Sequence, residues 1–148
     1  MPKTRSATET KALAKEYVQQ LEPQSTGAVV LALCGDLGAG KTTFIQGMAK
    51  ALDLDHRDVT SPTFLIIKKH RIKKIGRGFK RLIHIDCYRL NQVSEIANLG
   101  WSEIIAEPNN LVVIEWPDRI MSLLPKDTQM IRMTWLNDKE REIIYDQG

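Results

Sequence analysis

The sequence predicts an α/β fold, with a mostly parallel central sheet, antiparallel strands at its edges and helices on both faces. Three short segments support this class. Residues 28–34 form a continuous apolar run, typical of a strand buried on both faces of a sheet, and residues 81–86 and 111–115 are predicted to be two further buried strands. Helical patterns separate the runs, and such alternation is typical of parallel strands joined by crossover helices. With 148 residues, the chain is expected to form a single domain, residues 1–148.

The first half of the chain contains two predicted helices. Residues 6–21 carry apolar side chains at helical spacing, and Ser6 or Thr8 can cap the start of that helix. A turn at 22–27 leads into the first strand. The second helix is predicted at 41–54, directly after a glycine-rich loop.

The second half of the chain continues the alternation and closes with an antiparallel hairpin. In chain order we expect an extended segment at 60–69, a hairpin turn at 76–78, one or two short helices at 91–108 broken at Gly100, and two closing strands at 128–136 and 141–145 joined around Asn137 and Asp138.

The composition is that of an ordinary soluble globular protein, with 43% apolar and 26% charged residues. No apolar run is long enough to span a bilayer, and residues 1–11 lack the apolar core of a secretory signal. Cys34 and Cys87 are too few for a disulfide framework, and each is expected to be a small buried residue near a strand end. A cytoplasmic, reduced protein is therefore expected.

The glycine-rich loop matches the full Walker A pattern, with GDLGAGKT at residues 35–42. Its glycines allow backbone N–H groups to point inward at phosphates, and the helix that begins near Lys41 directs its positive dipole end at the same place. Lys41 would reach the β- and γ-phosphates, and the Thr42 hydroxyl would ligate Mg²⁺. The sequence therefore predicts a P-loop NTPase-like fold that binds a nucleoside triphosphate.

Two carboxylates stand at the ends of predicted strands. Asp86 and Glu115 would both face the ligand crevice, because the carboxyl ends of parallel strands meet at one edge of the sheet. One would hold Mg²⁺ and the other would orient the attacking water, although each could simply cap the following turn. The segment TSPTF at 60–64 is a candidate switch that senses the γ-phosphate. His84, within a strand, is expected to be a hydrogen-bonded core residue rather than a catalyst.

Four motifs in this order resemble the signatures of the bacterial TsaE (YjeE) family. They are GDLGAGKTTF at 35–44, SPTF at 61–64, HIDCYRL at 84–90 and IEWPDR at 114–119, and the resemblance covers roughly residues 8–145. The resemblance implies a small ATPase, with ATP and Mg²⁺ as cofactors, that is required for threonylcarbamoyl-adenosine (t6A) formation at tRNA position 37. It also implies that the transfer itself belongs to a TsaB–TsaD complex, and that ATP hydrolysis acts on this partner.

The family resemblance implies roles for individual residues. Thr42 and Glu115 would ligate Mg²⁺, and Asp86 would lie beside the γ-phosphate. Ser61 and Thr63 would belong to the switch-like segment. The residues expected at the nucleotide are Thr10, Asp36, Leu37, Gly38, Ala39, Gly40, Lys41, Thr42, Thr43, Asp86 and Trp116, with Lys41, Asp86 and Glu115 as the catalytic set.

One segment is more basic than the family pattern. Residues 68–81, a hairpin insertion, contain eight Lys or Arg and no acidic residue, whereas the rest of the chain has 13 basic and 18 acidic residues. Three interpretations remain open: a solvated edge that prevents strand association, a contact with tRNA phosphates or an acidic partner, or a lid over the active site.

Three other functions are compatible with parts of the sequence. A small P-loop kinase that phosphorylates a metabolite or nucleoside is the main alternative, but no separate acceptor-binding insertion is evident. A GTPase is disfavoured because no N-K-x-D segment is present. A non-catalytic nucleic-acid module would leave Asp86 and Glu115 unexplained. No obvious arginine finger lies in a loop that must reach the γ-phosphate. Arg89 and Arg119 are candidates, but each could instead form an internal ion pair, so slow turnover of the isolated chain is expected.

Overall fold

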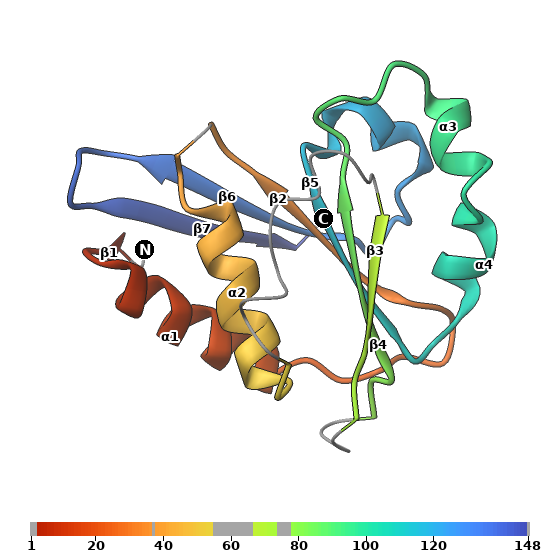
Figure 1. The fold of residues 1–148 in the computed structure, drawn as a ribbon, viewed down its shortest axis with the longest axis horizontal. Coiled ribbons are helices and arrows are strands. Elements are labelled where there is room, and N and C mark those ends of the chain that lie inside the picture. Colours follow the sequence, from red (N-terminus) through yellow and green to blue (C-terminus); the bar gives the residue numbers. More distant parts are fainter. Residues whose placement is uncertain (1–2, 37, 55–66, 74–77, 148) are drawn as a thin grey trace.

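The computed structural model describes residues 3–36, 38–54, 67–73 and 78–147. Apart from residues 60–66 and 76–77, which lie outside the described residues, the predicted elements are present, and their bounds agree with the expected ones to within a few residues (Figure 1). In chain order they are β1 (Lys3–Thr4), α1 (Ala7–Gln19), β2 (Val29–Cys34), α2 (Lys41–Ala51), β3 (Ile67–Arg71), β4 (Arg81–Asp86), α3 (Val93–Ala97), α4 (Trp101–Ala106), β5 (Asn110–Glu115), the 3-10 segment η2 (Pro117–Leu123), β6 (Gln129–Trp135) and β7 (Arg141–Gln147).

The strands described form one mixed sheet in the order β1-β7-β6-β2-β5-β4-β3 (Figure 1). Its centre is parallel, because β2 pairs with both β5 and β6 and β4 pairs with β5 in this direction. The β3–β4, β6–β7 and β1–β7 pairs are antiparallel. A mostly parallel sheet with antiparallel edges is thus confirmed, and the helix break at Gly100 is also confirmed.

Helices cover both faces of the sheet, as predicted, with α1 and α2 on one side and α3 and α4 on the other (Figure 1). The pleat of β5 shows why its sequence is apolar from Leu111 to Ile114. Leu111 and Val113 join the core beneath α1 and α2, while Val112 and Ile114 join the core beneath α3, α4 and η2. Among the described helices, none is long and apolar enough to cross a membrane.

Several features differ from the sequence-based expectation. Helix α2 ends at Ala51, three residues before the predicted end. Strand β1 and the 3-10 segment η2 are additional to the predicted elements. A strand of two residues such as β1 has no clear sequence pattern, because its pairing with β7 stabilises it. Cys87 is buried as expected, whereas Cys34 is half-buried, and both are free thiols. The first seven residues of the extended segment 60–69 and most of the turn 76–78 lie outside the described residues.

Helix α1 begins as the sequence suggests and then packs closely on α2. The Ser6 hydroxyl accepts a hydrogen bond from the Glu9 N–H at 3.1 Å, so Ser6 is the N-cap. The two helices approach most closely at Gly47, where an added Cβ would lie 2.6 Å from the Lys11 Cα and 2.7 Å from the Lys11 carbonyl oxygen. This glycine therefore sets the distance between the helices.

Gly47→Ala should lower the free energy of unfolding by about 1–3 kcal/mol, because the new methyl group overlaps the backbone of α1. Elsewhere in a helix the same change stabilises by about 1 kcal/mol. Urea denaturation of the purified chain measures the difference, and Lys50→Ala, at an exposed position of α2, is the control that should change stability little. A more stable Gly47→Ala variant would show that the helices are not in this close contact.

Candidate nucleotide site

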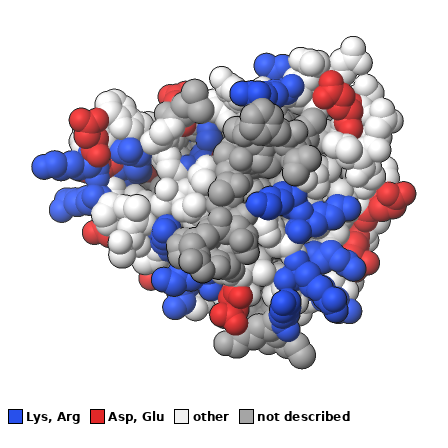
Figure 2. Space-filling view, viewed as in Figure 1, with Lys and Arg blue, Asp and Glu red and all other residues white. Residues whose placement is uncertain are grey.

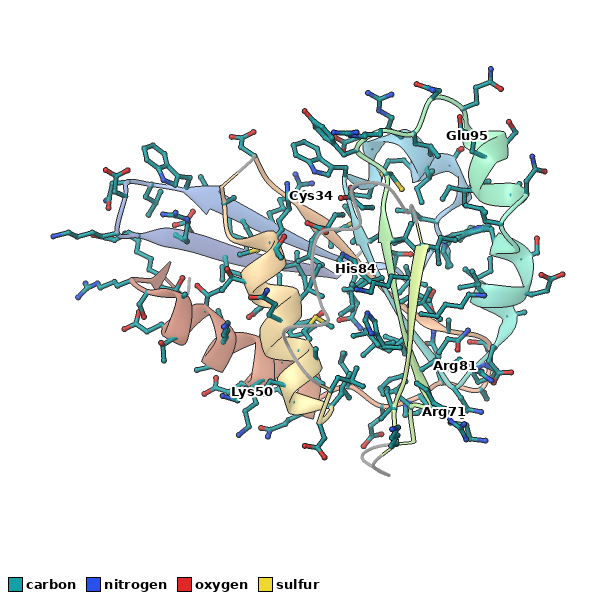
Figure 3. All side chains as sticks on the ribbon, in the orientation of Figure 1. Cys34, Lys50, Arg71, Arg81, His84 and Glu95 are labelled. Carbon is teal, nitrogen blue, oxygen red and sulfur yellow. The ribbon has the colours of Figure 1, made fainter. Side chains whose placement is uncertain are left out.

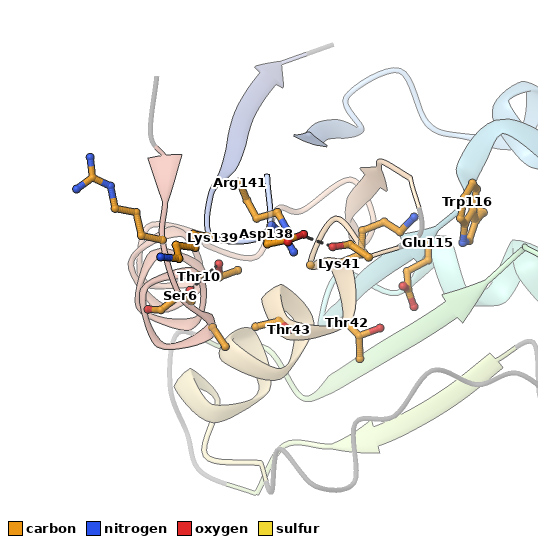
Figure 4. A pocket seen from close by; sticks show the side chains of 14 residues that line it. Ser6, Thr10, Lys41, Thr42, Thr43, Glu115, Trp116, Asp138, Lys139 and Arg141 are labelled. Carbon is orange, nitrogen blue, oxygen red and sulfur yellow. Dashed lines mark hydrogen bonds between the residues drawn. The ribbon is translucent and has the colours of Figure 1, made fainter. Parts of the chain in front are cut away.

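A pocket of about 450 Å³ lies at the carboxyl ends of the central strands (Figure 4). Four parts of the chain form it: the start of α1, the Walker A loop with the first turn of α2, the end of β5, and the turn between β6 and β7. The lining residues are Arg5, Ser6, Ala7, Thr10, Gly38, Gly40, Lys41, Thr42, Thr43, Glu115, Trp116, Asp138, Lys139 and Arg141.

The Walker A loop joins the end of β2 to the start of α2. Gly40 is the N-cap of α2 and has a φ of 98°, a left-handed conformation that favours glycine. Since glycine has no side chain to cap the helix, the first backbone N–H groups of α2 have no side-chain acceptor from this position. An 11-residue helix that begins in this way can bind an anion through its N-terminus.

Lys41 is held within the site by the loop and by an aromatic ring. Its ammonium donates a hydrogen bond to the Gly35 carbonyl and lies 3.6 Å from the centroid of the Trp116 ring. Burial lowers the pKa of Lys41, and the negative charges of Glu115 and Asp86 oppose this shift. The carboxylates thus favour the charged form of a lysine whose burial disfavours it.

Trp116 follows β5 in an uncommon backbone conformation. Its φ of 55° and ψ of 55° are left-handed, which is rare for a large side chain. The indole contacts Lys41 on one side, and its centroid is 5.0 Å from that of the Tyr88 ring. The strained turn therefore places an aromatic ring next to the Walker A lysine. Residues held in such uncommon backbone conformations often lie at functional sites.

Asp86 and Glu115 are neighbours across the β4–β5 pair, as expected from parallel strands. Glu115 lines the pocket, whereas Asp86 lies beside it, with its Oδ1 accepting a hydrogen bond from the Tyr88 N–H at 3.0 Å. Behind them, the fully buried His84 places its Nε2 2.7 Å from Glu115 Oε2. The expectation that His84 is a hydrogen-bonded core residue is confirmed, and its partner is the site carboxylate.

The oxygen atoms around the pocket fit Mg²⁺ that arrives with a nucleotide. The Thr42 hydroxyl and the Glu115 carboxylate line the same cavity. Mg²⁺ is usually held by one or two carboxylates together with substrate phosphates and water. Within the described ranges there is no cluster of three or more His, Cys, Asp or Glu that could hold a metal by itself. The donor set is therefore suited to an ion shared with phosphates.

Most of the residues expected at the nucleotide come together in this pocket. Of that set, the structure brings together Thr10, Gly38, Gly40, Lys41, Thr42, Thr43 and Trp116, and Glu115 joins them. Asp36 is exposed on the loop and Ala39 is buried beneath it, and neither lines the cavity. Leu37, Ser61 and Thr63 lie outside the described residues. The ligand roles of all these residues stay predictions.

Sequence reasoning missed the contribution of the β6–β7 turn. Arg141 donates from Nε to the Gly38 carbonyl at 3.1 Å and from Nη1 to the Asn137 carbonyl at 2.7 Å. Its side chain therefore ties the turn to the Walker A loop (Figure 4). The turn itself was predicted, but its place beside the loop depends on β6 pairing with β2, which local sequence patterns do not specify.

The described residues of the basic segment, 68–73 and 78–81, lie away from this pocket. None of them lines the cavity, and Arg81 stands at the opposite end of β4 from Asp86. Figure 2 shows Lys and Arg side chains gathered over the β3–β4 edge, where Figure 3 labels Arg71 and Arg81. The described part of the segment does not support a lid over the site.

The parallel sheet, the glycine-rich loop between β2 and α2 and the lysine at the helix start define a P-loop NTPase-like fold. The family model described as "Threonylcarbamoyl adenosine biosynthesis protein TsaE" matches residues 4–143. The chain therefore belongs to the TsaE family.

Individual relatives agree with this assignment. The Bacillus subtilis protein named tRNA threonylcarbamoyladenosine biosynthesis protein TsaE is 39% identical, with 93% of this chain and 78% of the relative covered. The Treponema pallidum protein of the same name is 37% identical over 79% of this chain and 80% of its own. The crystal structure of Bacillus subtilis YdiB superposes with a TM-score of 0.73 at 34% identity, covering 99% of this chain and 84% of the other.

Arg141→Ala should loosen both the β6–β7 turn and the Walker A loop, because it removes the hydrogen bonds to Gly38 and Asn137. Loss of about 1.4 kcal/mol would speed local amide exchange about tenfold. Hydrogen-exchange mass spectrometry of peptides covering 38–42 and 136–141 measures this. Lys139→Ala, which removes a neighbouring cation, is the control and should leave loop exchange unchanged. Faster exchange in the turn alone would contradict a link between the two segments.

Proposed function

We propose that this chain is a Mg²⁺-dependent ATPase that supports a TsaB–TsaD complex in t6A modification of tRNA position 37. The observation that carries the proposal is one pocket that combines the Walker A loop, Lys41, Thr42 and Glu115. The names of the relatives, which refer to tRNA threonylcarbamoyladenosine biosynthesis, supply the biological process.

In this proposal each part of the site has a separate task. The loop and the start of α2 bind the phosphates, and Lys41 leaves the Trp116 ring to contact the β- and γ-phosphates. Thr42 and Glu115 hold Mg²⁺, which neutralises phosphate charge when bound. Asp86, beside Glu115, orients the water that attacks the γ-phosphate.

The two arginines considered as arginine fingers do not line the described pocket. Arg119 instead donates from Nη1 to the Leu90 carbonyl at 2.7 Å, which holds it within the fold. We therefore expect the isolated chain to hydrolyse ATP slowly and a partner to complete the site. In other P-loop proteins an arginine supplied by a partner raises the rate by about 10³–10⁵.

Phosphate release from Mg-ATP, with and without TsaB–TsaD, tests the function. Slow release should rise at least about tenfold with the partners, and it should be lost in Lys41→Ala, which lacks the phosphate-binding ammonium. A rate of phosphate release that is the same with and without TsaB–TsaD would contradict the proposed role. Phosphate recovered on a small-molecule acceptor instead of in solution would favour a metabolite kinase.

The β3–β4 edge is the surface that we propose for contact with tRNA. Its exposed cations are Lys69, Arg71, Lys73, Lys80 and Arg81. Arg71 and Arg81 lie directly opposite each other across the strand pair, a like-charge arrangement that destabilises a sheet unless an anion is nearby. Within the described residues none of the five forms an ion pair with a carboxylate. RNA phosphates would supply the missing negative charge.

The double variant Arg71→Glu/Arg81→Glu should weaken tRNA binding and make its affinity less dependent on salt, because each lost phosphate contact lowers the slope of log K against log salt by about 0.7–0.9. Fluorescence anisotropy with labelled tRNA at several salt concentrations measures both effects. Lys50→Glu, at an exposed position of α2, is the control. Unchanged tRNA binding would favour a solvated edge, and selective loss of TsaB–TsaD binding would favour an acidic protein partner.

A further inference from the structure

We propose that His84 is a positioning residue that fixes the Glu115 carboxylate for Mg²⁺. The inference rests on the proposed function, because it concerns the ion that would accompany ATP in this site. It extends that function to a residue that does not line the pocket and whose sequence position, inside a strand, suggested only a core role.

The sheet places His84 directly behind the carboxylates. In the parallel β4–β5 pair, His84 is aligned with Val113, and Asp86 is aligned with Glu115. Because side chains alternate along a strand, His84 and Asp86 face the same side of the sheet, with His84 one pleat deeper. His84 is fully buried, and Glu115 is 3% exposed at the pocket wall. The hydrogen bond between them is therefore sheltered from water.

The hydrogen bond fixes which atoms remain available. Glu115 Oε2 is 2.7 Å from His84 Nε2. A carboxylate that holds Mg²⁺ is ionised and only accepts hydrogen bonds, so in the proposed role His84 donates from Nε2. The other ring nitrogen, Nδ1, is buried and has no hydrogen-bond partner among the described residues. Oε1 of Glu115 likewise accepts no hydrogen bond from the described residues. It is therefore the oxygen available to a metal ion or a metal-bound water.

This arrangement matches the way in which proteins orient metal-binding carboxylates. A ligating carboxylate is commonly hydrogen-bonded from behind, and removal of such a partner lowers metal affinity about 10- to 100-fold. Without His84, the Glu115 carboxylate would lose its only hydrogen-bond donor among the described side chains and could rotate within the site. The expected consequence is weaker Mg²⁺ binding, with little effect on contacts between the loop and the phosphates.

The test compares two amide variants that differ in reach. His84→Gln places an N–H group near the position of Nε2, whereas His84→Asn places one near Nδ1 and cannot contact Glu115. The readout is the Mg²⁺ concentration that gives half-maximal binding of a fluorescent ATP analogue, together with the affinity for the same analogue in EDTA. His84→Asn should require about 10- to 100-fold more Mg²⁺, and His84→Gln should remain close to the native chain. Affinity in EDTA should change little in either variant.

A variant of the neighbouring core separates positioning from general loss of stability. Leu82→Ala removes a fully buried side chain two residues earlier on the same strand. It should lower the melting temperature but leave the Mg²⁺ requirement unchanged. Equal Mg²⁺ requirements in His84→Asn, His84→Gln and the native chain would overturn the role of His84. A native chain whose nucleotide binding is absent or indifferent to Mg²⁺ would instead contradict the proposed function.

Discussion

The parallel register of β2, β5 and β4 is the constraint on which the rest of the site depends. Leu33 pairs with Glu115, and Glu115 in turn pairs with Asp86, so three strands end at nearly the same level. The Walker A loop leaves β2 at this level, because it begins at Gly35, directly after Cys34 and two residues after Leu33. A shift of one residue in β5 would turn Glu115 to the opposite face of the sheet.

The electrostatics of the site follow from this geometry. One buried ammonium, that of Lys41, lies near two strand-end carboxylates and against an aromatic ring. Burial disfavours the charged lysine, while Glu115 and Asp86 favour it. In the proposed function, this ammonium would exchange its contacts with the ring and the loop carbonyls for phosphate oxygens, which accept stronger charge-assisted hydrogen bonds.

The two ends of the chain complete the pocket from outside the central sheet. Helix α1 brings Thr10, whose hydroxyl is 2.7 Å from that of Thr4 on β1. The β6–β7 turn brings Arg141, which holds the Gly38 carbonyl. Strands β1 and β7 pair with each other, so these two walls are joined through the edge of the sheet. The pocket is therefore built by segments that are far apart in the sequence.

The sequence by itself determined the class of fold, the position of the phosphate loop and the candidate carboxylates. It could do so because burial on both faces leaves continuous apolar strands, and because phosphate binding requires glycines, Lys41 and Thr42 at fixed spacing. Only the tertiary structure decided that Asp86 lies beside the pocket rather than in its lining, and that Arg141 supports the loop. It also decided that His84 holds Glu115. These relations arise from pairing between distant strands, and the local periodicity of a sequence carries no information about which strands become neighbours.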